Sequence, residues 1–355
     1  MITVSRKPRV FMLDFVRALS IALVIMGHSL EQTFHFAEND VFAVQGDYKG
    51  MVVMMLFTLA RISVPFFLFL TGYFFLPRTY DSEGTKGFWL HNFLRLLLCT
   101  EIWIVLYNVF NHFFWNVAFE PLSVLRQMIF LEGVPAMDHY WYLPMILGIY
   151  LFLPIVANGL KHIDAKLLVF PVAVVLVVFA MTPALGSTDN TILEAGYSGG
   201  IFGTYVLLGY MVHEKVFRKV PAWALVLLAI LNFFFVHVVE YFQHILGTQD
   251  IVWYSWLTLI VTAVCCFELF DRHSGEAEVP TGAQKPVNVV SRYSFAMYLT
   301  HFPMVQACVR VMYWYTESAF LTFVVAAIVP FFASLLLCWL LDRIPKVGRY
   351  LLYMR

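Results

Sequence analysis

The sequence predicts an all-α polytopic membrane protein with about ten transmembrane helices and with its N- and C-termini cytoplasmic. Of 355 residues, 61% are hydrophobic and 13% are charged, whereas soluble domains are about 45–50% apolar. The mean hydropathy is +0.77. Long apolar runs recur along the whole chain, and about eighteen such residues suffice to cross a hydrocarbon layer of roughly 30 Å. These observations exclude a water-soluble enzyme.

Ten helical spans account for the apolar runs. They cover about 10–30, 50–76, 88–112, 139–158, 166–183, 197–213, 221–242, 250–270, 288–312 and 319–341. A membrane β-barrel would alternate polar and apolar residues, but Leu167 to Ala180 is apolar throughout. We expect a short interfacial helix at Pro121 to Leu131, no disulfide framework, and a single domain over 1–355 with no soluble domain appended.

The positions of the basic residues predict the orientation. If the N-terminus is cytoplasmic, only Lys49 and Arg126 fall in loops on the opposite side, and Arg17, Arg61 and Arg310 fall within spans. All the other Lys and Arg residues then face the cytoplasm, as membrane proteins prefer. The totals are balanced, with 23 Lys+Arg against 23 Asp+Glu, so no nucleic-acid partner is expected.

The first span carries Asp14, Arg17 and His28. An ionisable group at the centre of a span costs about 2.5–3.5 kcal/mol on insertion scales, so each is a functional candidate. The step from Arg17 to His28 turns a helix by about 1100° over roughly 16 Å, which puts both on one face. The alternative is a local Asp14–Arg17 ion pair and an ordinary interfacial histidine.

The second span adds Arg61, Pro65 and Thr71-Gly72. This span runs back toward the cytoplasm, so Arg61 is expected at a depth similar to that of His28, where the two side chains can meet. The alternative is that Arg61 extends to the outer interface. Pro65 is expected to kink the helix, and Gly72 to permit a close helix approach.

Other polar residues lie within or beside later spans. They are Glu101, Asn111, His112, His139, Tyr140, Trp141, Tyr142, His237, Glu240, His301 and Arg310. The aromatic residues among them also suit the belt of Tyr and Trp at a membrane interface. His301 also suits a hydrogen bond between packed helices near Pro303.

Five segments match the motifs of a known family in the right order. They are Leu13 to Leu19 leading to Gly27-His28, Arg61 to Phe67 with Thr71-Gly72-Tyr73, His139 to Pro144 before Leu147 to Leu151, Leu208-Gly209-Tyr210, and Ser294 to Pro303. On these segments the chain resembles the acyltransferase type 3 family of integral membrane O-acyltransferases. More narrowly, it resembles members that acetylate bacterial surface glycans such as the enterobacterial common antigen. The family often has two arginines after the second span, where His91 to Arg95 supplies one.

The resemblance implies an acyltransferase of the bacterial cytoplasmic (inner) membrane. Its donor would be acyl-CoA, in particular acetyl-CoA, from the cytoplasm, and its acceptor a hydroxyl of a surface glycan or of a polyprenyl-linked precursor; no permanently bound cofactor or metal is expected. Arg17, Arg95 and Arg292 are the candidates for contact with the donor phosphates. His28 is the expected general base, because imidazole titrates near neutrality, with an acyl-histidine intermediate as an alternative.

Candidates for the remaining roles are less specific. Arg61 or Tyr142 would stabilise the oxyanion. The candidates for acceptor binding are Asp14, Asn111, His112, His139, Glu240, His301 and Arg310. Two other functions fit buried charges in a ten-span bundle: a transporter of a lipid-linked glycan or other hydrophilic solute, and a sensor or assembly scaffold. The sequence shows no internal repeat of the kind that marks many transporters.

Overall fold

The protein is described by a computed structural model over residues 10–36, 41–184, 200–247, 252–274, 281–344 and 346–353. All regular secondary structure in these ranges is helical. Six stretches of this described part are long and apolar enough to cross a membrane: Phe11–Phe34, Asp47–Phe75, Ser82–Trp115, Asp138–Leu160, Ala222–Leu246 and Ala319–Leu341. The prediction of an all-α polytopic membrane protein is therefore confirmed.

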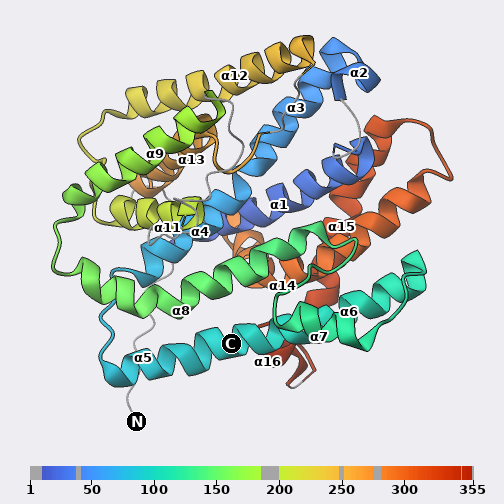
Figure 1. Ribbon diagram of the computed structural model, residues 1–355, viewed down its shortest axis with the longest axis horizontal. Coiled ribbons are helices and arrows are strands. Elements are labelled where there is room, and N and C mark those ends of the chain that lie inside the picture. The colour runs from blue at the N-terminus through green and yellow to red at the C-terminus, as the bar shows by residue number, and fades with distance from the viewer. Residues whose placement is uncertain are drawn as a thin grey trace.

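The helices follow the predicted spans closely. The first three spans correspond to α1 (Phe11–Phe34), to α3 (Asp47–Arg61) with α4 (Ser63–Phe75), and to α6 (Leu94–Trp115), which continues from α5 (Ser82–Phe88) through the π-helix η1 (Trp89–Phe93). The later spans correspond to α8 (Tyr142–Leu160), α9 (Val169–Ala184), α11 (Gly200–His213), α12 (Ala222–Leu246), α13 (Leu257–Arg272), α14 (Thr281–Met312) and α15 (Ala319–Leu341). Figure 1 shows α12 along one edge of the bundle and α6 along the opposite edge.

Shorter helices connect or flank the spans. They are α2 (Val41–Gln45), α7 (Pro121–Met128), η2 (Asp138–Trp141), η3 (Ala165–Leu168) and α16 (Val347–Tyr350). The helix α7 lies where a short interfacial helix was expected. The five cysteines are all free, in line with their places in spans.

The helix α1 is the central element, because it packs against α3, α4, α13, α14 and α15. It begins near Asp14 and Arg17 and ends beyond His28. We call the end of the bundle where α1 begins the basic end and the other the far end. At the far end Ser29 of α1 donates a hydrogen bond of 2.8 Å to the carbonyl of Ala326 in α15. That carbonyl lacks its helical donor because Pro330 has no N–H.

The kink expected from Pro65 is present. The helices α3 and α4 are separated at Ile62, whose N–H bonds to the carbonyl of Leu59 at 3.3 Å. Pro65 has no N–H to offer to the carbonyl of Arg61, so the regular ladder breaks at this turn. The break leaves the Arg61 side chain facing α1.

Glycines bring α4 and α11 into backbone contact. A Cβ atom added to Gly72 would lie 1.8 Å from the carbonyl oxygen of Val206, and one added to Gly209 would lie 2.1 Å from that of Phe69. Only residues without a side chain permit so close a crossing. This crossing fixes the position of α4 in the bundle.

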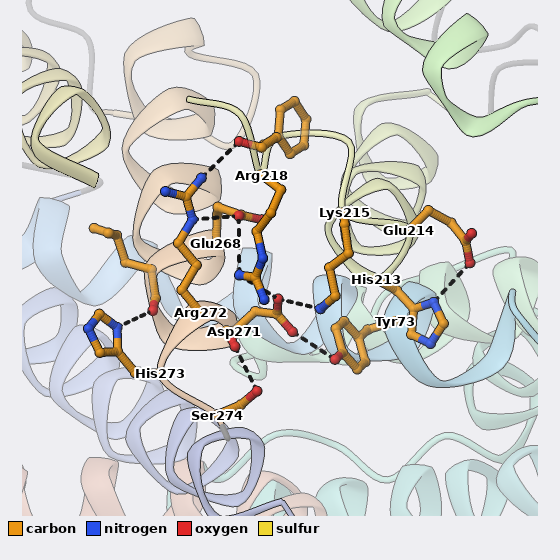
Figure 2. A network of polar contacts seen from close by, with 12 residues as sticks. Tyr73, His213, Glu214, Lys215, Arg218, Glu268, Asp271, Arg272, His273 and Ser274 are labelled. Carbon is orange, nitrogen blue, oxygen red and sulfur yellow. Dashed lines mark hydrogen bonds and ion pairs between the residues drawn. The ribbon is translucent and has the colours of Figure 1, made fainter. Parts of the chain in front are cut away.

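At the basic end, a cluster of paired charges ties α4, the α11–α12 connection and α13 together (Figure 2). Its members are Tyr73, Lys215, Arg218, Glu268, Asp271 and Arg272. Figure 2 shows that the carboxylate of Asp271 faces both Tyr73, which donates a hydrogen bond of 2.7 Å, and Lys215, whose Nζ lies 2.5 Å away. The side chain of Asp271 is fully buried, so the pairing satisfies a carboxylate that would otherwise be costly to bury.

Candidate functional site

A cavity beside Arg17 lies within the bundle. It has a volume of about 160 Å³ and lies between α1, α4, α6, α8 and α14. We call it the inner cavity; its lining residues are Arg17, Val24, Val64, Phe67, Leu70, Thr71, Phe74, Phe75, Leu96, Tyr142, Ile146, Tyr150, Ser294, Phe295, Tyr298 and Tyr353. The walls are mostly apolar, and a positive charge stands at the basic end.

Arg17 is held in place by its own helix and by α14. Its Nη1 atom lies 3.4 Å from Oδ1 of Asp14 and 3.5 Å from Oγ of Ser291. Ser291 in turn donates a hydrogen bond of 2.6 Å to Asp14. Asp14 lines neither of the two cavities described here. The i, i+3 pair therefore accounts for Asp14, whereas the Arg17 side chain is still one-third exposed and faces the cavity.

A second, smaller pocket surrounds His28. It has a volume of about 30 Å³. We call it the outer pocket; it is lined by Leu23, Val24, Gly27, His28, Glu31, Phe57, Ala60, Arg61, Ser63, Val64, His139, Trp141, Tyr142, Tyr254 and Tyr298. Four of these residues, Val24, Val64, Tyr142 and Tyr298, also line the inner cavity. The two spaces thus share a wall, and side chains of α1 line both of them.

A carboxylate joins His28 to Arg61. The Nδ1 atom of His28 lies 2.6 Å from Oε2 of Glu31, and Nη2 of Arg61 lies 2.9 Å from Oε1 of the same residue. Because the carboxylate only accepts here, the proton of the neutral imidazole is assigned to Nδ1. The Nε2 atom of His28 then carries a lone pair, as a general base requires.

Close packing of α1 on α3 makes this arrangement possible. A Cβ atom on Gly27 would lie only 3.2 Å from Cβ of Ala60, so the residues that follow Gly27 and Ala60 are brought together. Arg61 also donates to the hydroxyl of Tyr254 at 3.2 Å. Its guanidinium carbon lies 4.4 Å and 4.9 Å from the ring centres of Phe57 and Trp253, so aromatic faces support the buried charge.

His139 reaches the outer pocket from η2, with its orientation set by a neighbouring helix. Tyr107 of α6 donates a hydrogen bond of 2.8 Å to the carbonyl of Leu299, which Pro303 leaves without a helical donor. The Tyr107 oxygen therefore accepts from Nε2–H of His139, at 3.1 Å. The Nδ1 atom of His139 is then an acceptor, and it is buried with no partner among the described residues.

His301 completes a cluster of three imidazoles. Its Nδ1–H donates to the carbonyl of Tyr298 at 2.7 Å, which makes Nε2 an acceptor. Within the described ranges, that atom too is buried without a partner. The ring centres of His28 and His301 lie 5.4 Å apart, and His139 lies 6.1 Å from His28 and 5.4 Å from His301. The cluster presents acceptor atoms, so it suits a ligand that donates hydrogen bonds.

The comparison with protein families agrees with this arrangement. The family model of the acyltransferase domain matches residues 11–343, nearly the whole chain. The chain belongs to the acyltransferase 3 family. Neither the curated proteins nor the solved structures compared with it give a match. The resemblance drawn from the five sequence segments is therefore confirmed at the level of the family, and the acyltransferase interpretation stands over a transporter or a scaffold.

Two of the three predicted phosphate contacts of this acyltransferase lie outside the inner cavity. Arg95 sits over the ring of Tyr353, with its guanidinium carbon 4.7 Å from the ring centre, and Tyr353 lines the cavity. Arg292 is half exposed and pairs with Asp342 at 2.7 Å. Arg17 is thus the predicted donor contact that lines the cavity itself.

Several predicted acceptor-binding residues of the acyltransferase lie away from both cavities. Asn111 donates to the carbonyl of Pro135 at 2.5 Å, and Arg310 to that of Phe114 at 2.8 Å. His112 bonds to a loop carbonyl at 3.0 Å. Glu240 is buried beside His237, with 3.0 Å between Oε2 and Nδ1. The contacts of Asn111, His112 and Arg310 involve loops or the end of α6, whereas that of Glu240 lies within α12.

Sequence analysis did not identify Glu31, Tyr254 and Tyr298. The predicted first span ended near residue 30, whereas α1 continues to Phe34 and keeps Glu31 in helical register with His28. The i, i+3 spacing that singled out Asp14 and Arg17 also applies to His28 and Glu31. Tyr254 belongs to a stretch predicted as helix, but α13 begins only at Leu257.

Proposed function

We propose that this acyltransferase moves an acetyl group from acetyl-CoA to a hydroxyl of a surface glycan or of its lipid-linked precursor, with His28 as general base. The observation that supports this proposal is that the His28–Glu31–Arg61 chain lines the outer pocket, which shares a wall of four residues with the inner cavity. A donor held from one end and an acceptor held from the other would meet at that wall.

The inner cavity suits the donor. Its apolar walls match the pantetheine arm of CoA, and Arg17 at the basic end suits its phosphates, since guanidinium donors bind anionic oxygens strongly. The rise of the helix between Arg17 and His28 is roughly 16 Å, of the same order as the length of that arm. A donor anchored at Arg17 would thus present its thioester near His28.

His28 suits the role of base. Nε2 would take the proton of the acceptor hydroxyl while its oxygen attacks the thioester carbonyl. The new C–O bond forms, the C–S bond breaks, and the proton passes from Nε2 to the leaving thiolate, which departs as the thiol of CoA. Glu31 would hold the ring in the required tautomer and stabilise the transient imidazolium.

Tyr142 is the better candidate for oxyanion stabilisation. Arg61 is already engaged by Glu31 and Tyr254, and it lines the outer pocket but not the inner cavity. Tyr142 lines both the inner cavity and the outer pocket and is 7% exposed. A hydroxyl donor in such a dry site stabilises developing negative charge more than it would in water.

The outer pocket suits an acceptor that carries several hydroxyl groups. Nδ1 of His139, which lines the pocket, is a buried acceptor that a hydroxyl donor of a sugar would satisfy. Nε2 of His301 is a second buried acceptor; its ring lies behind the lining, 5.4 Å from that of His28. Trp141 and Tyr254, with ring centres 5.4 Å apart, form an aromatic wall. A sugar ring is larger than the pocket of about 30 Å³, so acceptor binding on this proposal displaces part of that wall.

The proposed orientation places the basic end and both termini in the cytoplasm, in a bacterial inner membrane. A fluorescent protein fused after Arg355 should then fluoresce, and alkaline phosphatase fused there should be inactive. The opposite pair of results would reverse the orientation and place the donor site on the wrong side for cytoplasmic acetyl-CoA.

The central experiment compares His28→Ala with His162→Ala, an exposed histidine in the loop after α8. Both proteins are purified in lipid nanodiscs, and acetyl-CoA binding is measured by calorimetry. Acetylation of surface glycans is measured by mass spectrometry in a strain whose own copy is deleted. We expect His28→Ala to bind acetyl-CoA but to lose acetylation by about 10²-fold or more, whereas His162→Ala retains both. Undiminished acetylation with His28→Ala would refute the proposed role of His28.

A further inference from the structure

The last described segment of the chain, 346–353, lies beside the inner cavity, which its Tyr353 lines. It begins after α15, forms the single turn α16, and continues across α6. The carbonyl of Leu351 accepts hydrogen bonds from Trp103 at 2.7 Å and from Cys99 at 3.3 Å. Leu352 is 1% exposed. The segment is therefore anchored on α6 and packed into the bundle.

Tyr353 brings this segment into the cavity wall. Its hydroxyl donates to the carbonyl of Asn92 in the π-helix η1 at 3.1 Å, and its ring lies 5.3 Å from that of Phe295. The ring lines the inner cavity together with Arg17. The ring also contacts the guanidinium of Arg95. Tyr353 thus connects an apolar wall to a cation that lies just outside it.

We propose that Tyr353 is a positioning residue for the acyl-CoA donor: its ring packs along the pantetheine arm and holds Arg95 where the donor phosphates pass. This inference rests on the proposed function. It extends the donor site to a segment beyond the family match, which ends at residue 343. A guanidinium fixed over an aromatic ring loses less freedom when it binds phosphate than a mobile one does.

The test measures binding and turnover with two donors. Acetyl-CoA contacts the whole cavity, whereas S-acetyl-N-acetylcysteamine carries the thioester and only the adjacent part of the arm, without phosphates. Tyr353→Ala is compared with Tyr353→Phe, which keeps the ring, and with Tyr350→Ala, which removes an exposed ring on the same segment. Tyr353→Leu, which retains apolar volume, gives the same comparison if the alanine variant does not fold.

We expect Tyr353→Ala and Tyr353→Leu to raise the Kd and KM for acetyl-CoA at least about tenfold, with kcat changed less than about threefold. The same variants should change kcat/KM for S-acetyl-N-acetylcysteamine by less than about twofold, and Tyr353→Phe and Tyr350→Ala should resemble the wild type with both donors. An equal loss with both donors, or no loss with acetyl-CoA, would overturn the assignment of Tyr353. If the wild-type chain does not bind acetyl-CoA, the proposed function fails together with this inference. If the wild-type chain binds acetyl-CoA and Tyr353→Ala binds it equally well, this inference alone is refuted.

Discussion

The Nδ1 atom of His28 lies 2.6 Å from Oε2 of Glu31, one turn further along the central helix. The second oxygen of that carboxylate pairs with Arg61 at 2.9 Å. The imidazole is thereby held in one tautomer, which leaves Nε2 with a lone pair, and the residue lines the outer pocket. The predictions below test this relationship and the packing that produces it.

Glu31→Gln should lower kcat by about 10²-fold or more. His28 and Arg61 bond to different oxygens of the Glu31 carboxylate. Glutamine replaces one of these oxygens by an NH2 donor, so one of the two donors faces another donor and loses its partner. The Kd for acetyl-CoA should stay within about twofold of the wild type, because Glu31 does not line the inner cavity. Glu83→Gln, which removes an exposed pair with Lys86, is the matched control; an unchanged kcat in Glu31→Gln would contradict the orienting role.

Val24→Phe should reduce acetyl transfer at least about tenfold per folded molecule. Val24 is 5% exposed and lines both cavities, so an added ring fills the space where donor and acceptor meet. Val226→Phe on the exposed face of α12 should leave transfer unchanged. Stability is monitored in parallel, since overpacking alone costs about 1–3 kcal/mol. Full transfer by a folded Val24→Phe protein would show that the reaction does not use this wall.

Tyr107→Phe should lower the free energy of unfolding by about 1–3 kcal/mol, because the carbonyl of Leu299 and Nε2–H of His139 both lose their partner. In a Pro303→Ala background the loss should be smaller, since the new N–H at residue 303 can bond to the carbonyl of Leu299. Thermal unfolding of the four proteins completes a double-mutant cycle. Equal losses of unfolding free energy in both backgrounds would show that the stabilising effect of the Tyr107 hydroxyl does not depend on Pro303.

Gly72→Ala should destabilise the protein by about 3 kcal/mol or more, because the added Cβ meets the backbone oxygen of Val206 at 1.8 Å. Gly148→Ala is the control: nothing lies within 4 Å of a Cβ placed there, and alanine favours a helix over glycine by about 1 kcal/mol. Thermal unfolding in detergent measures both. A tolerated Gly72→Ala would mean that α4 and α11 do not cross as closely as described.

Periodicity and span length predicted the helices well, because a segment in lipid must satisfy its own backbone hydrogen bonds whatever surrounds it. The failures are at helix ends. The helix α1 runs on past residue 30 and takes Glu31 with it, while α13 starts at Leu257 and leaves Tyr254 in a non-helical stretch beside Arg61. The backbone N–H and C=O groups at a helix end have no partner within the helix. Where the helix ends therefore depends on the neighbouring segments that can bond to these groups, and such segments are distant in the sequence.

The sequence by itself determined the class of the protein, the placement of Arg17 and His28 on one helix face, and the family. These depend on local spacing along one helix and on the order of motifs along the chain. Only the tertiary structure decided which polar groups line the site. Arg310, Asn111 and His112 were as polar as His139 and His301, yet the former bond to loops or a helix end and the latter pack against His28. Glu240 pairs with His237 within α12. The physical reason is that a polar residue in a membrane bundle must find a partner, and whether that partner is a loop carbonyl or a reaction site is decided by how distant helices pack.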